Sequence, residues 1–258
     1  MPTPTPTRAD DLDPEEPAPA PEAPSRLRRS LWLLDLYRTA LGKKYAMALT
    51  GVVWMGYVFA HMVGNLKLYT GQAEMDNYAV WLRELGYPVL PEDGLLWGIR
   101  IVLIVTLVIH VHAAYALTVM NRRARPENYH SKRDYIAADF AARTMRWTGV
   151  IVLLFIAYHL ADLTFGWVNP NPDFVYAETV YANVVASFSL LPVAAFYVVA
   201  NVALGYHLYH GAWSLFQSMG WNKPRFNHWR RWFAVAFALI VVVPNISFPV
   251  AVQLGIIS

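Results

Sequence analysis

Five long apolar segments dominate this sequence, at about residues 44–67, 96–121, 145–168, 189–217 and 232–256. At 1.5 Å per residue, an α-helix of that length crosses the roughly 30 Å hydrocarbon core of a bilayer. A chain in lipid must satisfy its own backbone hydrogen bonds, and continuous apolar segments of this length do so as helices. The sequence therefore predicts an all-α integral membrane protein built as a bundle of five transmembrane helices.

The composition supports this prediction and narrows the chemistry. Hydrophobic residues make up 56% of the 258 residues and charged residues 15%, which is too apolar for a soluble domain of this size. Cysteine is absent, which excludes disulfides, thiolate zinc sites, cysteine-ligated iron–sulfur clusters and covalently attached c-type haem within this chain. Histidine is then the obvious ligand for a redox metal.

The N-terminal region differs in composition from the rest of the chain. Its first 24 residues hold eight prolines and six acidic residues with almost no large apolar side chains, so a disordered tail is expected over residues 1–25. The membrane domain then covers residues 26–258. No apolar core follows a basic start, so the tail is not a signal peptide. Residues 26–41 alternate basic and apolar side chains, which predicts a short helix on the membrane surface or packed on a partner protein.

Prolines mark two of the spans. Pro192 lies in the first turn of the fourth span, where a missing amide donor does little harm. Pro244 and Pro249 lie inside the fifth span and are expected to kink or break that helix. The fifth span contains no histidine and no charge, so we expect it only to complete the bundle.

The basic residues predict the orientation of the chain. Eighteen of the 21 Lys and Arg residues fall in the N-terminal segment and in the connections after the second and fourth spans. The other three are Lys67, Arg83 and Arg100. Since cytoplasmic loops carry the excess of Lys and Arg, the N-terminus is predicted to be cytoplasmic and the C-terminus to lie outside.

Histidines occur in four spans and at two depths. His61 and His159 each lie six or seven residues before the outer end of their spans, about 10 Å below the surface. His112 and His210 lie deeper, roughly 18 to 30 Å from the same surface. Two histidines at one depth on different helices can supply both axial ligands of a haem iron. The pattern therefore predicts two haems, although hydrogen-bonded histidines that join helices are the alternative.

Two histidine doublets leave the deeper ligands open. His110 and His112 point about 200° apart on a helix, so only one can face the bundle. His207 and His210 share a face, and depth does not separate them. Glycines accompany the histidines and would admit a porphyrin or simply close helix packing: Gly51, Gly56, Gly64, Gly149, Gly205 and Gly211.

Several stretches over residues 30–256 resemble a known family. They read WLLDLYRTALGKKYAMALTGVV, AHMVGNLKLYTG, DNYAVWLRELGYP, HAAYALTVMNRRARPENY and GYHLYHGAWSLFQSMGW. In these stretches the chain is similar to the membrane cytochrome b subunit of succinate dehydrogenases and fumarate reductases, in the class with one subunit, five helices and two haems. The resemblance implies a multi-pass protein of the bacterial cytoplasmic membrane.

The resemblance also implies the ligands. The first and third helices would hold an outer haem through His61 and His159, and the second and fourth an inner haem through His112 and His210. His110 and His207 would then pack or hydrogen-bond around the ligands. Some relatives carry a glutamate, linked to transmembrane proton movement, where this chain has Leu208, which puts such a proton path in doubt.

The implied function is electron transfer between partners and a quinone. The subunit would anchor a flavoprotein and an iron–sulfur protein on the cytoplasmic face, as part of a succinate:quinone oxidoreductase, and would use two haem b groups and usually menaquinone. The chain itself has no recognisable site for succinate, flavin or iron–sulfur clusters, and no nucleic-acid partner is expected. Electrons would pass from the partner through the inner haem to the outer haem and the quinone.

Quinone reduction consumes protons, so acidic residues near the outer haem are candidates for their delivery. The candidates are Asp162, Glu74, Asp76 and Glu84. A solvated surface charge is the alternative for the three loop acids. Arg100 is a candidate partner for a haem propionate or a marker of the interface. The basic loop 122–146 would dock the iron–sulfur protein or serve only to set topology.

Two other functions are compatible with such a bundle. One is the cytochrome b subunit of a hydrogenase or formate dehydrogenase, which also uses pairs of histidines to hold haem. The other is a transporter or scaffold whose histidines line a polar pathway, although no inverted repeat is apparent.

Overall fold

The structure is a computed structural model that describes residues 32–124, 140–221 and 223–258. The predicted tail over residues 1–25 lies outside the described residues, as do the start of the predicted surface helix and most of the basic loop 122–146. In the described part every regular element is helical. The all-α prediction is thereby confirmed.

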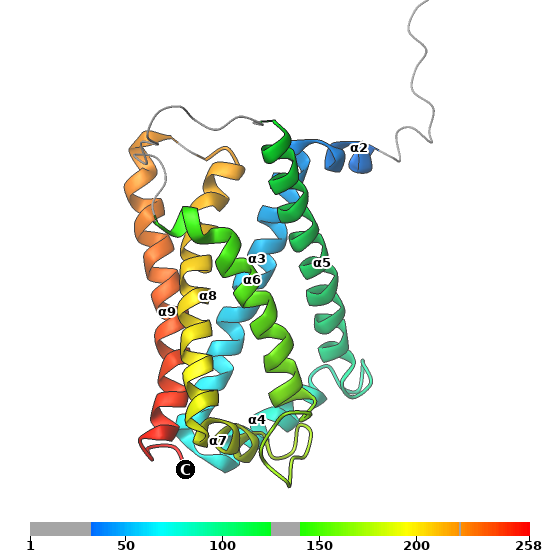
Figure 1. Cartoon of the computed structure of the whole chain (residues 1–258). Helices are drawn as coiled ribbons and strands as arrows, with labels where there is room; N and C mark the ends of the chain where they lie inside the picture. The colour runs from blue at the N-terminus through cyan, green and yellow to red at the C-terminus, as the bar shows by residue number, and fades with distance from the viewer. Residues whose placement is uncertain (1–31, 125–139, 222) are drawn as a thin grey trace, which may run out of the picture.

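Five helices in the described part are long and apolar enough to cross a membrane (Figure 1). They are α3 (Ala40–Asn65), α5 (Gly94–Arg123), α6 (Phe140–His159), α8 (Leu191–Ser218) and α9 (Asn227–Gln253). Short turns extend three of them: η2 (Leu66–Thr70) after α3, the π-helical η3 (Leu160–Thr164) after α6, and η4 (Pro224–Phe226) before α9. The protein is therefore a multi-pass membrane protein with the predicted five-helix bundle.

The bundle presents apolar side chains outward and packs through small ones. On α5, the outward residues Ile101, Ile104 and Val108 are 57%, 60% and 63% exposed, as expected for side chains that meet lipid. Lipid is as apolar as leucine, so helix contacts depend on close packing of small side chains. Helix α8 packs along α9 and α6, and α5 packs along α3. Buried alanines are frequent in α8 and α9: Ala194, Ala200, Ala203, Ala212, Ala234 and Ala238.

The two prolines of the last span do not break it. Helix α9 runs continuously through Pro244 and Pro249, so of the expected kink or break the break does not occur, and the kink stays a prediction. Prolines are tolerated inside transmembrane helices because neighbouring helices and hydroxyl side chains satisfy the polar backbone groups that a proline disturbs. Pro192 lies in the first turn of α8, as predicted.

Two short helices, α4 (Gln72–Glu84) and α7 (Val180–Ser189), lie together at one end of the bundle (Figure 1). The carboxylate of Asp76 on α4 accepts a hydrogen bond from the backbone amide of Tyr181 in the first turn of α7, at 3.0 Å. Neither helix was predicted, because helices this short are marginal alone and depend on such tertiary contacts. We refer to this end as the α4–α7 end.

At the opposite end, α2 (Trp32–Arg38) is followed by a sharp turn into α3 (Figure 1). Thr39 caps α3 by accepting a hydrogen bond from the Gly42 amide at 2.9 Å. A Cβ atom at Gly42 would lie 1.9 Å from the carbonyl oxygen of Leu36, so only glycine fits there. This close approach fixes the direction in which α2 leaves the bundle.

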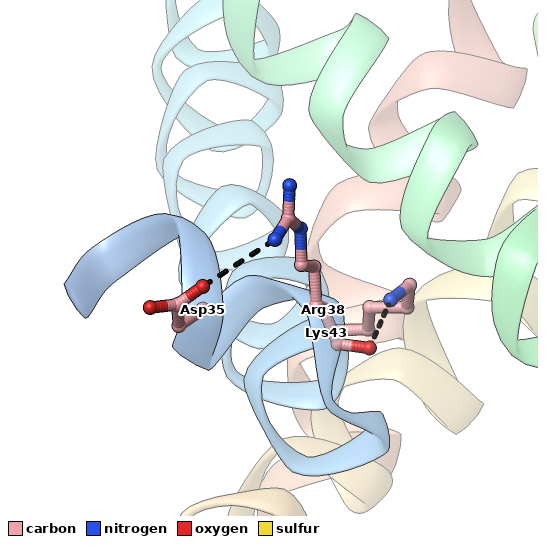
Figure 2. A network of polar contacts seen from close by, with 3 residues as sticks. All are labelled: Asp35, Arg38 and Lys43. Atoms are coloured by element: carbon pink, nitrogen blue, oxygen red, sulfur yellow. Dashed lines mark hydrogen bonds and ion pairs between the residues drawn. The ribbon is translucent and has the colours of Figure 1, made fainter. Parts of the chain in front are cut away.

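Lys43 holds α2 in place from the first turn of α3. Its ammonium is buried and donates to the carbonyl oxygens of Tyr37 at 2.9 Å and Arg38 at 2.8 Å. Figure 2 shows the hydrogen bond from Lys43 to Arg38 beside the exposed ion pair of Arg38 with Asp35. A cation at the last carbonyls of a helix satisfies acceptors that have no helical partner. The described part of the predicted surface helix is thus tied to the bundle at what we call the α2 end.

Candidate functional site

The structure brings the rings of His61 and His159 into edge-to-face contact. His61 lies on α3 and His159 is the last residue of α6, and their ring centres are 5.8 Å apart with an angle of 79° between the planes. Both side chains are half-buried. These are the two residues that depth counting paired. We call them the 61/159 pair.

Polar and aromatic neighbours hold His61 on its helix. The Asn65 side-chain amide, one turn further along α3, lies 3.2 Å from Nδ1 of His61. The ring of Tyr57, one turn earlier, lies 5.6 Å from the His61 ring. Because these three residues share one face of α3, the helix turns a polar stripe towards α6 near the α4–α7 end.

A second pair lies deeper in the bundle, formed by His110 on α5 and His207 on α8. Their ring centres are 6.4 Å apart with an angle of 60° between the planes. Both are half-buried. We call them the 110/207 pair. The two pairs use four different helices and lie at two levels along the bundle.

His112 and His210, which the family resemblance favours as ligands, are not brought together. His112 is exposed and its Nδ1 lies 2.6 Å from the hydroxyl of Tyr37 on α2, with the two rings stacked. Since residues two apart on a helix point about 200° away from each other, His112 turns away from α8 when His110 faces it. His210 lies half-buried one turn beyond His207. The pairing of His112 with His210 stays a prediction, and this geometry favours the other member of each doublet.

The hydrogen bonds of His110 leave one ring nitrogen free. Nδ1 of His110 lies 3.1 Å from the carbonyl oxygen of Met47 on α3. A carbonyl can only accept, so Nδ1 carries the proton and donates, and Nε2 keeps its lone pair. The Thr50 hydroxyl also lies 3.1 Å from Nδ1 and itself donates to the Ala46 carbonyl at 2.7 Å. Histidines that bind metals are oriented in this way by a carbonyl behind the ring.

His207, the other member of the 110/207 pair, lacks the hydrogen bond that orients His110. Nδ1 of His207 is buried and has no hydrogen-bond partner among the residues that the structure describes. Unpaired buried polar atoms are rare in native proteins and call for an explanation. Trp54, on α3 between the levels of the two pairs, also has a buried indole nitrogen without a partner. Both groups are therefore available to a bound molecule.

The helices that carry facing histidines are held apart. Neither α3 with α6 nor α5 with α8 is among the helix pairs that pack along one another. Glycines lie beside the deeper pair: a Cβ atom at Gly51 would be 3.7 Å from Cε1 of His110, and one at Gly149 would be 3.4 Å from Cε1 of His207. Contact across the bundle at these levels is thus made by imidazole rings rather than by helix backbones. Of the other glycines that accompany the histidines in the sequence, Gly64 and Gly205 pack closely against side chains, and Gly56 and Gly211 face open space.

The spacing of both pairs suits a metal held between two imidazoles. A metal about 2 Å from each nitrogen places the ring centres about 6 Å apart, and the observed separations are 5.8 and 6.4 Å. The described residues contain no group of three or more His, Cys, Asp or Glu side chains placed to hold a metal ion. Each pair could offer two nitrogens to a metal, whose other ligands would then have to come from outside the chain, as the four nitrogens of a planar macrocycle would.

Asp162 is the most enclosed of the candidate acids. It lies on η3, three residues after His159, with no exposed surface. Its carboxylate accepts hydrogen bonds from the Ser187 hydroxyl at 2.5 Å, the Tyr197 hydroxyl at 2.8 Å and the Asn169 side-chain amide at 3.0 Å. A buried carboxylate needs such donors to offset its lost hydration. Asp162 thus joins α6, the following loop, α7 and α8.

The three loop acids take other roles at the α4–α7 end. Glu74 forms an exposed ion pair with Lys67 at 3.2 Å. Asp76 caps α7 through the Tyr181 amide. Glu84 is the exposed last residue of α4. None of these contacts involves a histidine of either pair.

Arg100 lies in the second turn of α5, near the same end. Its guanidinium donates a hydrogen bond to the hydroxyl of Tyr176 and lies over the ring of Trp97, 5.0 Å from the ring centre. Cations placed over aromatic faces in this way are typical of the membrane interface. The role of a haem-propionate partner stays a prediction.

Sequence reasoning missed the residues that support the histidines. Thr50 and Asn65 carried a weak signal, because each is a polar side chain in an otherwise apolar span. Tyr197 and the carbonyl of Met47 carried none: a tyrosine is common in such a span, and a backbone carbonyl has no sequence signature. Their contacts come from other helices, so only the packed bundle reveals them.

A pocket of about 560 Å³ lies elsewhere, at the α2 end, between the end of α8 and the start of α9. Phe216, Trp221 and Arg230 are among its lining residues, and no histidine of either pair contributes to it. It is therefore separate from the histidine site.

Comparison of the chain with family models, curated proteins and solved structures found no match.

Proposed function

We propose that this protein is a membrane cytochrome b that holds two haem b groups and anchors a succinate:quinone oxidoreductase. The observation that carries the proposal is the two facing histidine pairs, at two depths on four helices and spaced for a metal between them. Bound haem would supply one-electron transfer between an iron–sulfur partner and a quinone, usually menaquinone. The side chains of the protein would bind and orient the two haems.

The four ligands in this proposal are His61 with His159 for the outer haem and His110 with His207 for the inner haem. His110 replaces His112 because its ring meets that of His207 on α8 while its Nδ1 is engaged by α3, whereas the exposed His112 contacts Tyr37. His207 replaces His210 because its ring meets that of His110. The helix pairs remain those implied by the family resemblance.

The distribution of charge supports an orientation for the complex. The start of α3, the end of α5 and the start of α9 lie together at the α2 end (Figure 1), and the adjacent segments carry most of the Lys and Arg residues. Cytoplasmic ends carry that excess, so the flavoprotein and iron–sulfur partners would bind at the α2 end. The 61/159 pair would then lie towards the outer face of a bacterial cytoplasmic membrane, with quinone chemistry nearby.

The test is purification of the tagged protein in mild detergent, with its partner chains identified by mass spectrometry. We expect two protohaems per polypeptide and a reduced-minus-oxidised spectrum of b type when succinate is added as donor. His61→Ala is expected to remove one of the two haems. Absence of protohaem from the purified complex would refute the proposal.

The same preparation separates the competing functions. Reduction of the haems by hydrogen or formate but not by succinate would identify the chain as the cytochrome b of a hydrogenase or formate dehydrogenase. A complex without visible redox signals would favour a transporter or scaffold. Both measurements use the intact complex, so loss of a partner during purification is detected by the mass spectrum.

A further inference from the structure

Tyr197 connects the buried carboxylate of Asp162 to the 61/159 pair. Its hydroxyl donates to Asp162 at 2.8 Å, and the same oxygen lies 3.5 Å from Nδ1 of His159. Tyr197 is 4% exposed and Asp162 is fully buried, so neither group has water as an easy alternative partner. The three side chains therefore form a chain of polar contacts that runs from η3 through α8 to the end of α6.

The order of donors along this chain follows from the number of protons. A tyrosine hydroxyl has one proton, and the shorter contact gives that proton to Asp162. The hydroxyl oxygen is then an acceptor towards His159, so Nδ1 of His159 carries the proton and Nε2 keeps its lone pair. In this tautomer Nε2 of His159 is free to bind a metal.

The tyrosine ring is held so that its hydroxyl cannot easily turn away. Phe155 and Phe188 pack edge-to-face against it, with ring centres at 5.2 and 4.8 Å. Ser187 donates to the same Oδ2 atom of Asp162 as Tyr197 does, and Asn169 donates to Oδ1, so the carboxylate is itself held in place. Groups fixed by packing and by further hydrogen bonds impose orientation on the side chains they contact.

No such arrangement backs the 110/207 pair. Nδ1 of His110 contacts a neutral carbonyl and a hydroxyl, and Nδ1 of His207 has no partner. A carboxylate acting through Tyr197 makes the imidazole of His159 a more electron-rich ligand and stabilises the more positive, oxidised metal. The two pairs thus differ in that a carboxylate lies behind His159, whereas only neutral groups contact His110.

We propose that Tyr197 is a positioning residue for His159, through which Asp162 selects the ligand tautomer and lowers the midpoint potential of the outer haem relative to a site without the carboxylate. This inference rests on the proposed function. It assigns Asp162 a role that acts through a ligand, in place of direct proton delivery to a quinone.

The test is a redox titration of the purified complex carrying Tyr197→Phe, with both haems followed by absorbance and by the EPR signals of their oxidised forms. At a fixed potential we expect the ratio of oxidised to reduced outer haem to fall about threefold, equivalent to a rise of about 30 mV in its midpoint potential at 59 mV per tenfold. The outer haem's EPR signal should also shift. The inner haem should change in neither measurement.

Tyr181→Phe is the matched control. Tyr181 is also buried, its hydroxyl donates to the carbonyl oxygen of Ser258 at 3.2 Å, and it contacts neither His159 nor Asp162 in the interactions described. Asp162→Asn is the second variant, for use if Tyr197→Phe loses haem, since it keeps the volume and removes the charge. It should shift the outer haem in the same direction.

The outcomes separate this inference from the proposed function. Unchanged outer-haem potential and EPR signal in Tyr197→Phe and Asp162→Asn would overturn the positioning role and leave the cytochrome intact. Equal shifts of both haems, or an equal shift in Tyr181→Phe, would overturn it as well, because the effect would then be general. Wild-type protein without haem would overturn the proposed function and this inference with it.

Discussion

The two histidine pairs are built from the same residue type but are supported in different ways. The 61/159 pair is backed by side chains: Asn65 stands behind His61, and Tyr197 with Asp162 stands behind His159. The 110/207 pair is backed mainly by the α3 backbone, through the Met47 carbonyl. A histidine can therefore be oriented either by a polar side-chain network or by a backbone carbonyl. A network that contains a carboxylate places a negative charge near the imidazole, whereas a carbonyl does not.

The surroundings of the two histidine pairs also differ in how many segments of the chain they join. The network around Asp162 joins four segments of the chain, so it is a structural junction as well as a support for His159. The hydrogen bonds of His110 join α5 to α3, which already pack along each other, and its contact with His207 on α8 is made by the ring alone. Damage near the 61/159 pair should therefore cost stability, whereas damage near the 110/207 pair should mainly cost ligand binding.

The largest effect is expected from removing a ligand of the deeper pair. His110→Ala and His207→Ala should each reduce haem from two to one per polypeptide, because each change removes one of the two axial bonds that would hold the inner haem between its helices. His112→Ala is the matched control and should keep both haems, since His112 faces Tyr37. The measurement is protohaem per polypeptide in purified protein. Loss of a haem in His112→Ala with retention in His110→Ala would restore the pairing implied by the family resemblance.

The next effect should appear at the other pair as a loss of stability. Asp162→Ala leaves the buried Ser187 and Tyr197 hydroxyls without this acceptor and removes one of the two acceptors of Asn169, which should cost about 3 kcal/mol or more of unfolding free energy. Denaturation of the purified protein in detergent measures it. Glu84→Ala, at an exposed acid of the same end, should leave the transition unchanged. Equal stability of the two variants would contradict the view of Asp162 as a junction.

A smaller effect is expected from the hydroxyl beside His110. Thr50→Val preserves shape and removes one contact to Nδ1, while the Met47 carbonyl remains, so stability should fall by about 1 kcal/mol. Transfer of haem to an excess of apomyoglobin should become faster for the inner haem only. Faster loss of the outer haem would show that the two sites are not supported separately.

The smallest effect should come from Tyr37→Phe. This change removes the hydroxyl that contacts the exposed His112 at 2.6 Å and touches neither pair. Haem content and both midpoint potentials should match those of the wild type in the same titration. A change at the inner haem would mean that α2 and His112 act on that site after all.

Much of the architecture is readable from the amino-acid order. Span length and apolarity determine five membrane helices, because a chain in lipid has few other ways to satisfy its backbone. The placement of His61 and His159 near the same ends of their spans determines their shared depth, because rise per residue is constant in a helix. The candidate ligands were therefore restricted to a few histidines before any packing was known.

Only the tertiary structure decides which of those histidines face each other. The choice between His110 and His112 depends on how α5 is rotated about its own axis, and that rotation is set by packing against α3. Helices α4 and α7 likewise exist through mutual contacts that span more than one hundred residues of sequence. The carboxylate of Asp162 lies 35 positions from Tyr197, and only folding brings it behind His159, because hydrogen-bond partners across a bundle leave no periodic trace in the sequence.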